Sequence, residues 1–315
     1  MDHFTLRILQ AAKPTAAVFM MIAVSLAAQK PAGQQTTQKR FGSAEEAVQS
    51  IIKAAKTNNR TEMLAILGSD AEDLLSSGDK IADRRARQLI LVALNEKWSL
   101  ASQGPNSKTL IIGNEEWPYP IPLVKDKGGW RFDTAAGREE ILYRRVGRNE
   151  LSTIKSCRVY VSAQKEYAEK GHDGKAAGLY AQKLASEPGK QDGLFWKTGP
   201  GEDFSPLGEL AAEAASEGYS RAESGPTPLH GYLFRLLTAQ GAAAPGGAKS
   251  YITNGEMKGG FALVAYPADY RNSGVMTFIV NQDGVVYEKD LGEQTAQVAS
   301  QMKEYNPDRS WRKTR

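Results

Sequence analysis

The sequence predicts an α+β protein of two domains, each with helices packed against an antiparallel β-meander. In each half of the chain, apolar residues first recur at helical spacing. Short apolar runs or runs with period-two alternation follow, as expected of strands, and Gly, Pro and Asn residues separate those runs. The chain has 315 residues, of which 41% are hydrophobic and 24% charged. This length and composition suit two ordinary folded domains.

The first 27 residues have the pattern of an export signal. Arg7 and Lys13 are basic, and a 13-residue apolar run from Ala16 to Ala28 follows them. Such a run is too short to span a bilayer but suits a signal peptide, and the small residues up to Ala27 favour cleavage there. We expect a periplasmic or secreted protein without a stable membrane span, and a retained anchor is the alternative. Residues 28–40 are polar and predict a flexible leader.

The first predicted domain covers residues 41–147. Ser43-Ala-Glu-Glu46 is a capping box in which each end residue satisfies a backbone amide at the start of a helix. Two further helices are expected near residues 63–67 and 81–98. Short apolar runs then predict strands over residues 98–102, 109–112, 121–124 and 129–133, of which the last two form a hairpin.

The second predicted domain covers residues 148–315. Gly147 interrupts a helical pattern, and Asn149 is the expected N-cap of a long new helix. A loop-rich segment follows, with short helices expected at residues 176–185 and 206–215. Strands are expected at residues 232–237, 261–266, 275–280 and 285–287, with positive φ at Asp283-Gly284, before a closing helix at residues 294–305.

The first domain resembles nuclear-transport-factor-two-like and cystatin-like folds. Trp130 and Phe132 stand where those folds place a Trp-x-Phe strand. The resemblance implies a pocket that Trp98, Trp117 and Trp130 would line, although core tryptophans are the alternative. The usual His–Asp pair of such pockets is absent, because this segment contains no histidine.

The second domain resembles the globular part of type IV pilins and pseudopilins. The resemblance is carried by the helix from Asn149 to Tyr167, the strand Gly231-Tyr-Leu-Phe234, and the hairpin Gly274 to Gly284. It implies a long helix leading into a β-meander. No prepilin-type apolar helix directly precedes Asn149, which argues against a filament subunit.

Over its mature length the chain resembles a bacterial exported family called domain of unknown function number 2950. The strings that carry this are GRNEL (147–151), PTPLHGY (226–232), LTAQG (237–241), GGFALVAYP (259–267) and NQDGVVYEKDLG (281–292). The resemblance implies no activity, cofactor or catalytic residue.

The sequence contains few residues or motifs that indicate a catalytic, metal-binding or nucleic-acid-binding site. The net charge is +4 and acids lie among the basic runs, so nucleic acid is not an expected partner. Cys157 is the single cysteine, and its helical spacing with Ile154 and Val161 predicts burial rather than catalysis. His172 and His230 are too far apart for a helical zinc motif, and neither a nucleophile elbow nor a phosphate-binding loop is present. We expect no metal and no cofactor.

His230 is the candidate catalytic residue. It follows Pro226-x-Pro228 and precedes Gly231 at the start of a strand, where a rigid imidazole suits a general base or a ligand contact. A structural histidine that bonds the backbone at a domain junction is the alternative. Tyr232 is a candidate ligand-binding residue, with core packing as its alternative.

These observations favour a non-catalytic exported module that binds or assembles with a protein of the cell envelope. One alternative is a periplasmic hydrolase-type enzyme centred on His230, which needs an acid or nucleophile within about 3 Å of the ring or one water away. The other is a minor subunit associated with a pilus or a secretion system.

Overall fold

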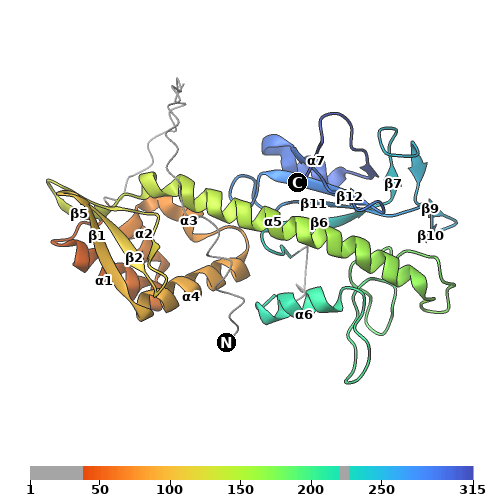
Figure 1. Ribbon diagram of the computed structural model, residues 1–315, viewed down its shortest axis with the longest axis horizontal. Coiled ribbons are helices and arrows are strands. Elements are labelled where there is room, and N and C mark those ends of the chain that lie inside the picture. The colour runs from red at the N-terminus through yellow and green to blue at the C-terminus, as the bar shows by residue number, and fades with distance from the viewer. Residues whose placement is uncertain (1–37, 220–226, 315) are drawn as a thin grey trace. The chain divides into compact units, whose positions relative to one another are not determined.

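The computed structural model describes residues 38–219 and 227–314, and the predicted export signal lies outside them. The described residues belong to one compact unit of helices and sheets, most of whose strand pairs are antiparallel, which confirms the predicted α+β class (Figure 1). They contain two separate hydrophobic cores. One is built from residues 41–132 and the other from residues 157–305.

The first core begins with the helices α1 (Ala44–Lys56), α2 (Arg60–Leu67), η2 (Ser69–Ala71), α3 (Glu72–Leu75) and α4 (Lys80–Glu96). The positions of α1, α2 and α4 agree closely with the predicted ones, whereas η2 and α3 were not predicted. Ser43 Oγ accepts from the Glu46 amide at 3.0 Å, as the capping box predicts. Glu46 Oε2 accepts from the Gly42 amide at 2.9 Å instead of the expected Ser43 amide, so the reciprocal bond lies one residue earlier.

An antiparallel sheet packs on these helices. Its strands are β1 (Trp98–Gly104), β2 (Ser107–Ile112), β3 (Trp117–Pro118), β4 (Leu123–Asp126) and β5 (Gly129–Phe132). The order is β1-β2-β4-β5 with β3 beside β2, and Leu123 pairs with Phe132 in the predicted hairpin. Buried Leu110, Ile112 and Phe132 meet the apolar face of α1 in the core.

Helix α5 runs from Thr134 to Glu169 without interruption, although Gly147 predicted a break. Asn149 is therefore inside the helix, where its buried Nδ2 donates to Ser273 O at 2.9 Å. The predicted boundary between residues 147 and 148 falls within this helix. A helical glycine costs only about 1 kcal/mol relative to alanine, so packing along the rest of α5 outweighs it.

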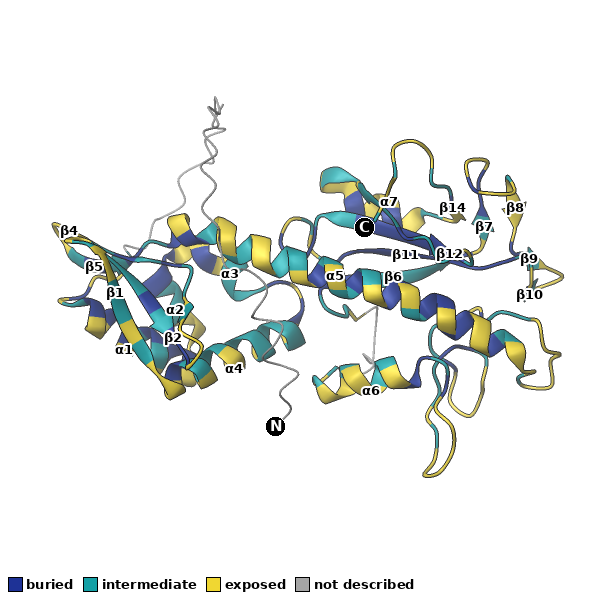
Figure 2. Ribbon diagram, viewed as in Figure 1, coloured by how far each residue is buried: buried dark blue, intermediate teal, exposed yellow. Residues whose placement is uncertain are grey.

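The second core lies between α5, a second antiparallel sheet and helix α7 (Thr295–Gln301). The sheet order is β15-β13-β12-β11-β6, with β6 (Tyr232–Leu237), β11 (Ala262–Pro267), β12 (Met276–Asn281), β13 (Tyr287–Asp290) and β15 (Arg312–Lys313). Every residue of β11 is buried because α5 and α7 both contact this strand. Burial along the second half of α5 is visible in Figure 2.

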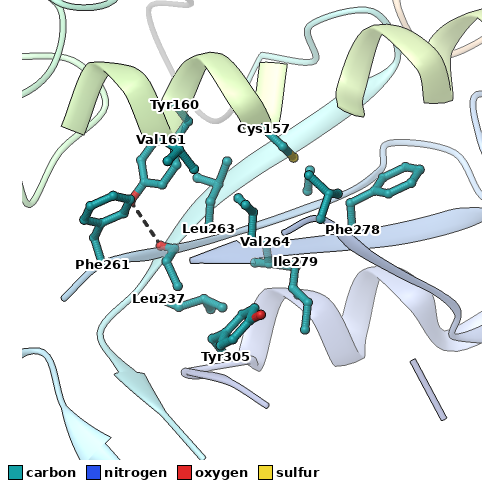
Figure 3. Close-up of a cluster of buried hydrophobic side chains, with 14 of the residues drawn as sticks. Cys157, Tyr160, Val161, Leu237, Phe261, Leu263, Val264, Phe278, Ile279 and Tyr305 are labelled. Carbon is teal, nitrogen blue, oxygen red and sulfur yellow. Dashed lines mark hydrogen bonds between the residues drawn. The ribbon is translucent and has the colours of Figure 1, made fainter. Parts of the chain in front are cut away.

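Side chains from α5 point into this core. Cys157 and Tyr160 lie over Leu263 and Val264, and the Tyr160 hydroxyl donates to Ala262 O at 3.2 Å (Figure 3). The Cys157 thiol is buried, as its helical spacing predicted. The remaining described elements are α6 (Gly208–Ser216), η3 (Gly292–Gln294), β7 (Ala239–Gln240), β8 (Lys249–Ser250), β9 (Ile252–Thr253), β10 (Glu256–Met257) and β14 (Glu304–Tyr305).

Three further local predictions for the second half were wrong. Residues 176–185 form no helix, because their loop instead bonds to the end of α5 and to β10. In the turn after β12, Gly284 has a φ of +76° but Asp283 does not have a positive φ, so no primed turn forms and β13 starts at Tyr287. The closing helix ends at Gln301, because residues 304–305 pair with β7.

Candidate functional site

His230 lies in a tight turn that leads into β6. Leu229 and Tyr232 exchange backbone hydrogen bonds of 2.9 and 3.1 Å around His230 and Gly231. The φ angles of these two central residues are +49° and +77°, the combination found in a type I′ turn. Positive φ is uncommon for a residue other than glycine, so the turn holds the imidazole in a defined direction.

The imidazole of His230 meets a carboxylate. Its Nε2 lies 2.6 Å from Oε2 of Glu217, just after α6, and Glu217 Oε1 pairs with Arg85 of α4. The Tyr219 ring stands edge-on to the imidazole at a centroid distance of 5.6 Å. Within residues 38–219 and 227–314, no serine, threonine or cysteine side chain hydrogen-bonds to His230. The arrangement is a histidine–carboxylate pair that lacks a hydrogen-bonded nucleophile among those residues.

Asp79 is buried beside this pair, and four groups donate to it. Its Oδ1 accepts from the amides of Ile81 and Ala82 at 3.1 and 3.0 Å, which caps α4. Its Oδ2 accepts from the Tyr219 hydroxyl at 2.7 Å and from the Gly231 amide at 2.9 Å. Burial, and then the bond to Asp79, raise the pKa of Tyr219, so this phenol keeps its proton.

Arg145 of α5 makes a separate set of hydrogen bonds. It donates to the carbonyls of Asp73 and Leu74 at 2.8 Å and to the Asn272 side chain. Asn272 Nδ2 in turn donates to Ser76 O at 2.8 Å. We call the set Asp79, Arg85, Glu217, Tyr219 and His230 the junction network. Its members bond mainly to one another and to the backbone, which suits the structural alternative for His230.

A cavity of about 210 Å³ lies elsewhere, at the C-terminal end of α5. Tyr167 and Lys170 come from the end of the helix, residues 172–183 come from the loop behind it, Asp192 comes from the following loop, and Glu256 and Met257 come from β10. Four chain segments therefore bring aromatic, charged and apolar side chains to one hollow.

The aromatic wall of the cavity has a fixed orientation. His172 stacks on Tyr167 with ring centroids 4.0 Å apart and an interplanar angle of 18°. The two ring nitrogens of His172 lie 3.0 Å from Tyr167 O and 3.1 Å from Gln191 Oε1. The Tyr167 hydroxyl donates to Gln191 O at 2.7 Å, so both rings are held from two sides.

Some charges around the cavity neutralise one another. Lys183 Nζ lies 2.6 Å from both Asp192 and Glu187. The hydrogen bond from Lys183 holds the pKa of Asp192 below its usual range, and burial with the nearby acids raises the pKa of Tyr167 to about 12. By contrast, the side chains of Lys170, Lys175 and Glu256 form neither an ion pair nor a hydrogen bond with any residue that the structure describes, whereas Asp173 accepts from the Gln191 amide at 2.9 Å. These three charges are available to a ligand.

The tryptophans proposed as a pocket lining belong to the first core. Trp98 and Trp117 pair with Ile112 from either side of β2, and both pack against that core. Trp130 is buried, with the Lys108 ammonium 5.3 Å from its ring centroid. Tyr232 is buried in the second core, where its hydroxyl donates to Met276 O at 2.9 Å. The four candidates thus lie in two separate cores.

Sequence reasoning singled out His230 but missed its partner Glu217 and the cavity. Within the described ranges, no group of three or more His, Cys, Asp or Glu side chains is arranged to hold a metal ion. None of the described helices has both the length and the apolar character needed to cross a membrane.

Comparison with known families decides one question. The sequence model described as Protein of unknown function (DUF2950) matches residues 38–314. The chain belongs to the DUF2950 family. No curated protein and no solved structure matches this DUF2950 chain significantly, so the resemblances to pilins and to nuclear-transport-factor-two-like folds stay predictions.

Proposed function

We propose that this DUF2950 protein is a non-catalytic, exported binding module of the cell envelope, with a small-molecule site at the end of α5 and an envelope protein as its partner. The observation that carries the proposal is the contrast between the two places where polar side chains gather. In the junction network the carboxylates of Asp79 and Glu217 already have partners, whereas the cavity presents three charged side chains with neither an ion pair nor a hydrogen bond in the described structure. Export is supported by the residues up to Ala27.

The structural role of His230 supports the same proposal. Its amide donates to the Tyr219 hydroxyl at 3.2 Å, and its ring bonds to Glu217, which also pairs with Arg85. Residues of α4, of the segment after α6 and of the turn into β6 are joined in this way. Groups that satisfy one another stabilise a fold and leave little capacity for a substrate.

The test is a ligand-observed NMR screen of the mature chain against small polar metabolites. Ala176 lines the cavity, so Ala176→Trp would fill it. His230→Asn is the matched control, because asparagine tolerates positive φ and the substitution removes only the imidazole. We expect Ala176→Trp to abolish ligand signals and His230→Asn to preserve them. The reverse pattern would contradict the proposal.

A hydrolase-type enzyme centred on His230 is the second candidate. The 2.6 Å contact with Glu217 favours it, because a carboxylate that orients an imidazole is the partner a general base needs. Glu217→Gln would then reduce ester or amide hydrolysis by about a hundredfold or more and change its pH profile. Equal hydrolysis rates with and without Glu217 would remove this candidate.

A further inference from the structure

We infer that the cavity at the end of α5 binds a small zwitterion of the amino-acid type, with Lys170 and Lys175 holding its carboxylate and Glu256 its ammonium. The inference rests on the proposed function and names the ligand class of that site. It is carried by the unpaired charges, the volume, the apolar wall and the fixed backbone of the cavity.

The charged side chains of the cavity favour a ligand that carries both a positive and a negative group. Asp192 and Lys183 form an ion pair, and Asp173 accepts from the Gln191 amide at 2.9 Å. Asp173 has no ion pair within the described residues, but its carboxylate has this hydrogen bond. Two ammonium groups and one carboxylate, on Lys170, Lys175 and Glu256, have neither an ion pair nor a side-chain hydrogen bond in the described structure. Two lysines suit the two oxygens of a carboxylate, and a single carboxylate suits one ammonium group.

The volume restricts the ligand to a small molecule. Water occupies roughly 30 Å³ per molecule in the liquid, so about 210 Å³ corresponds to about seven waters. That space admits an amino acid or the end of a short peptide. It is below the range of roughly 300–1,000 Å³ that is typical of pockets for larger ligands.

An apolar wall gives the ligand side chain a surface to pack on. Met257 is buried, and Leu179 and Tyr180 are partly buried beside it. Such a wall favours an aliphatic or aromatic side chain over a polar one, because burying apolar surface is favourable. Among zwitterions we therefore expect leucine-like molecules to bind better than glycine.

The backbone around the cavity is held in place before any ligand binds. Tyr180 N donates to Met257 O at 2.8 Å, and Gly178 N donates to Ala168 O at 2.8 Å, which ties the loop to β10 and to α5. A Cβ atom at Gly171 would lie 2.2 Å from Lys175 O, so the loop closes tightly there. A preformed site loses less conformational entropy when it binds.

The test is calorimetric titration of the mature chain with L-leucine, L-leucyl-L-alanine, N-acetyl-L-leucine and L-leucinamide. The acetyl compound lacks the ammonium and the amide lacks the carboxylate. We expect each to bind about tenfold or more weakly than L-leucine, since each loses a charge-assisted hydrogen bond. Binding of the dipeptide in place of the free amino acid would identify a peptide end as the source of the zwitterion.

Variants test which side chains bind the carboxylate of the ligand and which bind its ammonium group. The double substitution Lys170→Gln with Lys175→Gln should weaken L-leucine by about tenfold or more while hardly changing the already weak leucinamide. Glu256→Gln should weaken L-leucine and hardly change N-acetyl-L-leucine. Lys190→Gln is the control, because Lys190 pairs with Glu187 and does not line the cavity. Far-ultraviolet circular dichroism of each variant confirms folding.

The outcomes separate the inference from the proposed function. If all four probes fail to bind but another metabolite binds and Ala176→Trp abolishes its signal, the zwitterion is wrong and the binding module stands. Equal affinity for L-leucine, the acetyl compound and the amide would also overturn the zwitterion. If no small molecule binds at all, both proposals fail.

Discussion

The Tyr219 hydroxyl donates a 2.7 Å hydrogen bond to Asp79 Oδ2, although 140 positions separate the two residues in the sequence. The same oxygen accepts from the Gly231 amide, and the other carboxylate oxygen caps α4. One buried carboxylate, only 2% exposed, thereby links a helix of the first half to the turn that starts β6. The histidine that looked catalytic in the sequence occupies that turn.

We expect Asp79→Ala to lower the free energy of unfolding by about 2–4 kcal/mol, because it removes a helix cap and leaves the Gly231 and Tyr219 donors without an acceptor. Asp79→Asn keeps an oxygen for the cap and removes only the second acceptor, so we expect an intermediate loss. Urea unfolding followed by circular dichroism measures both. Glu304→Gln, on an exposed side chain, serves as control. A loss below about 0.5 kcal/mol in Asp79→Ala would show that the network contributes little.

Two glycines of α5 should respond in opposite directions to the same substitution. Gly147 has no atom within 4 Å of the position of a Cβ, so Gly147→Ala should stabilise the chain by about 0.5–1 kcal/mol through helix propensity. At Gly137 a Cβ would lie 2.7 Å from the backbone of Ile121 and Pro120. Gly137→Ala should therefore destabilise by about 1–3 kcal/mol. Thermal unfolding of the two variants beside wild type checks the signs, and equal signs would contradict the continuous helix.

Most of the secondary structure follows from local patterns. Strand β6 lies at the predicted residues 232–237, and the start of α1 follows from Ser43. The break at Gly147 was wrong for a physical reason. A helix-breaking preference of about 1 kcal/mol is smaller than the stabilisation from packing on both sides of it, and local sequence carries no information about that packing.

Local sequence patterns were also insufficient to predict the two candidate sites, the surroundings of His230 and the cavity at the end of α5. Proline and glycine around His230 identified a rigid histidine, but Glu217 and Arg85 come from other elements and lie beside it only in the folded chain. The cavity combines four segments that share no motif. The one local signal is the cluster of Lys170, His172 and Lys175 directly after the last helical residue, Glu169, where charged and aromatic side chains gather around a glycine.

Cys157 should be unreactive in the folded protein. Its burial raises the pKa of the thiol to about 12, and only the thiolate is an effective nucleophile. At pH 8 we expect iodoacetamide to alkylate the native chain at least about a hundredfold more slowly than the chain in concentrated urea. Mass spectrometry of timed samples measures this ratio. A Cys157→Ser chain that also carries Ser162→Cys, at an exposed position of the same helix, should react rapidly when native.

Asp126 should make stability depend on pH at the acidic end. The Arg40 guanidinium and the Gly128 amide donate to Asp126 and lower its pKa to about 2, against roughly 3.9 in an unfolded chain. Because the folded value is the lower one, this contribution is fully present above the unfolded pKa and is lost as the pH falls through about 2. We therefore expect wild type to be more stable than Asp126→Asn at pH 6, with a difference that shrinks below about pH 4 and is lost below about pH 2. Urea titrations across this range measure the difference, and Asp203→Asn, on an exposed side chain without an ion pair in the described structure, should show no such trend. A difference that stayed constant with pH would mean that the Arg40–Asp126 contact is not populated in solution.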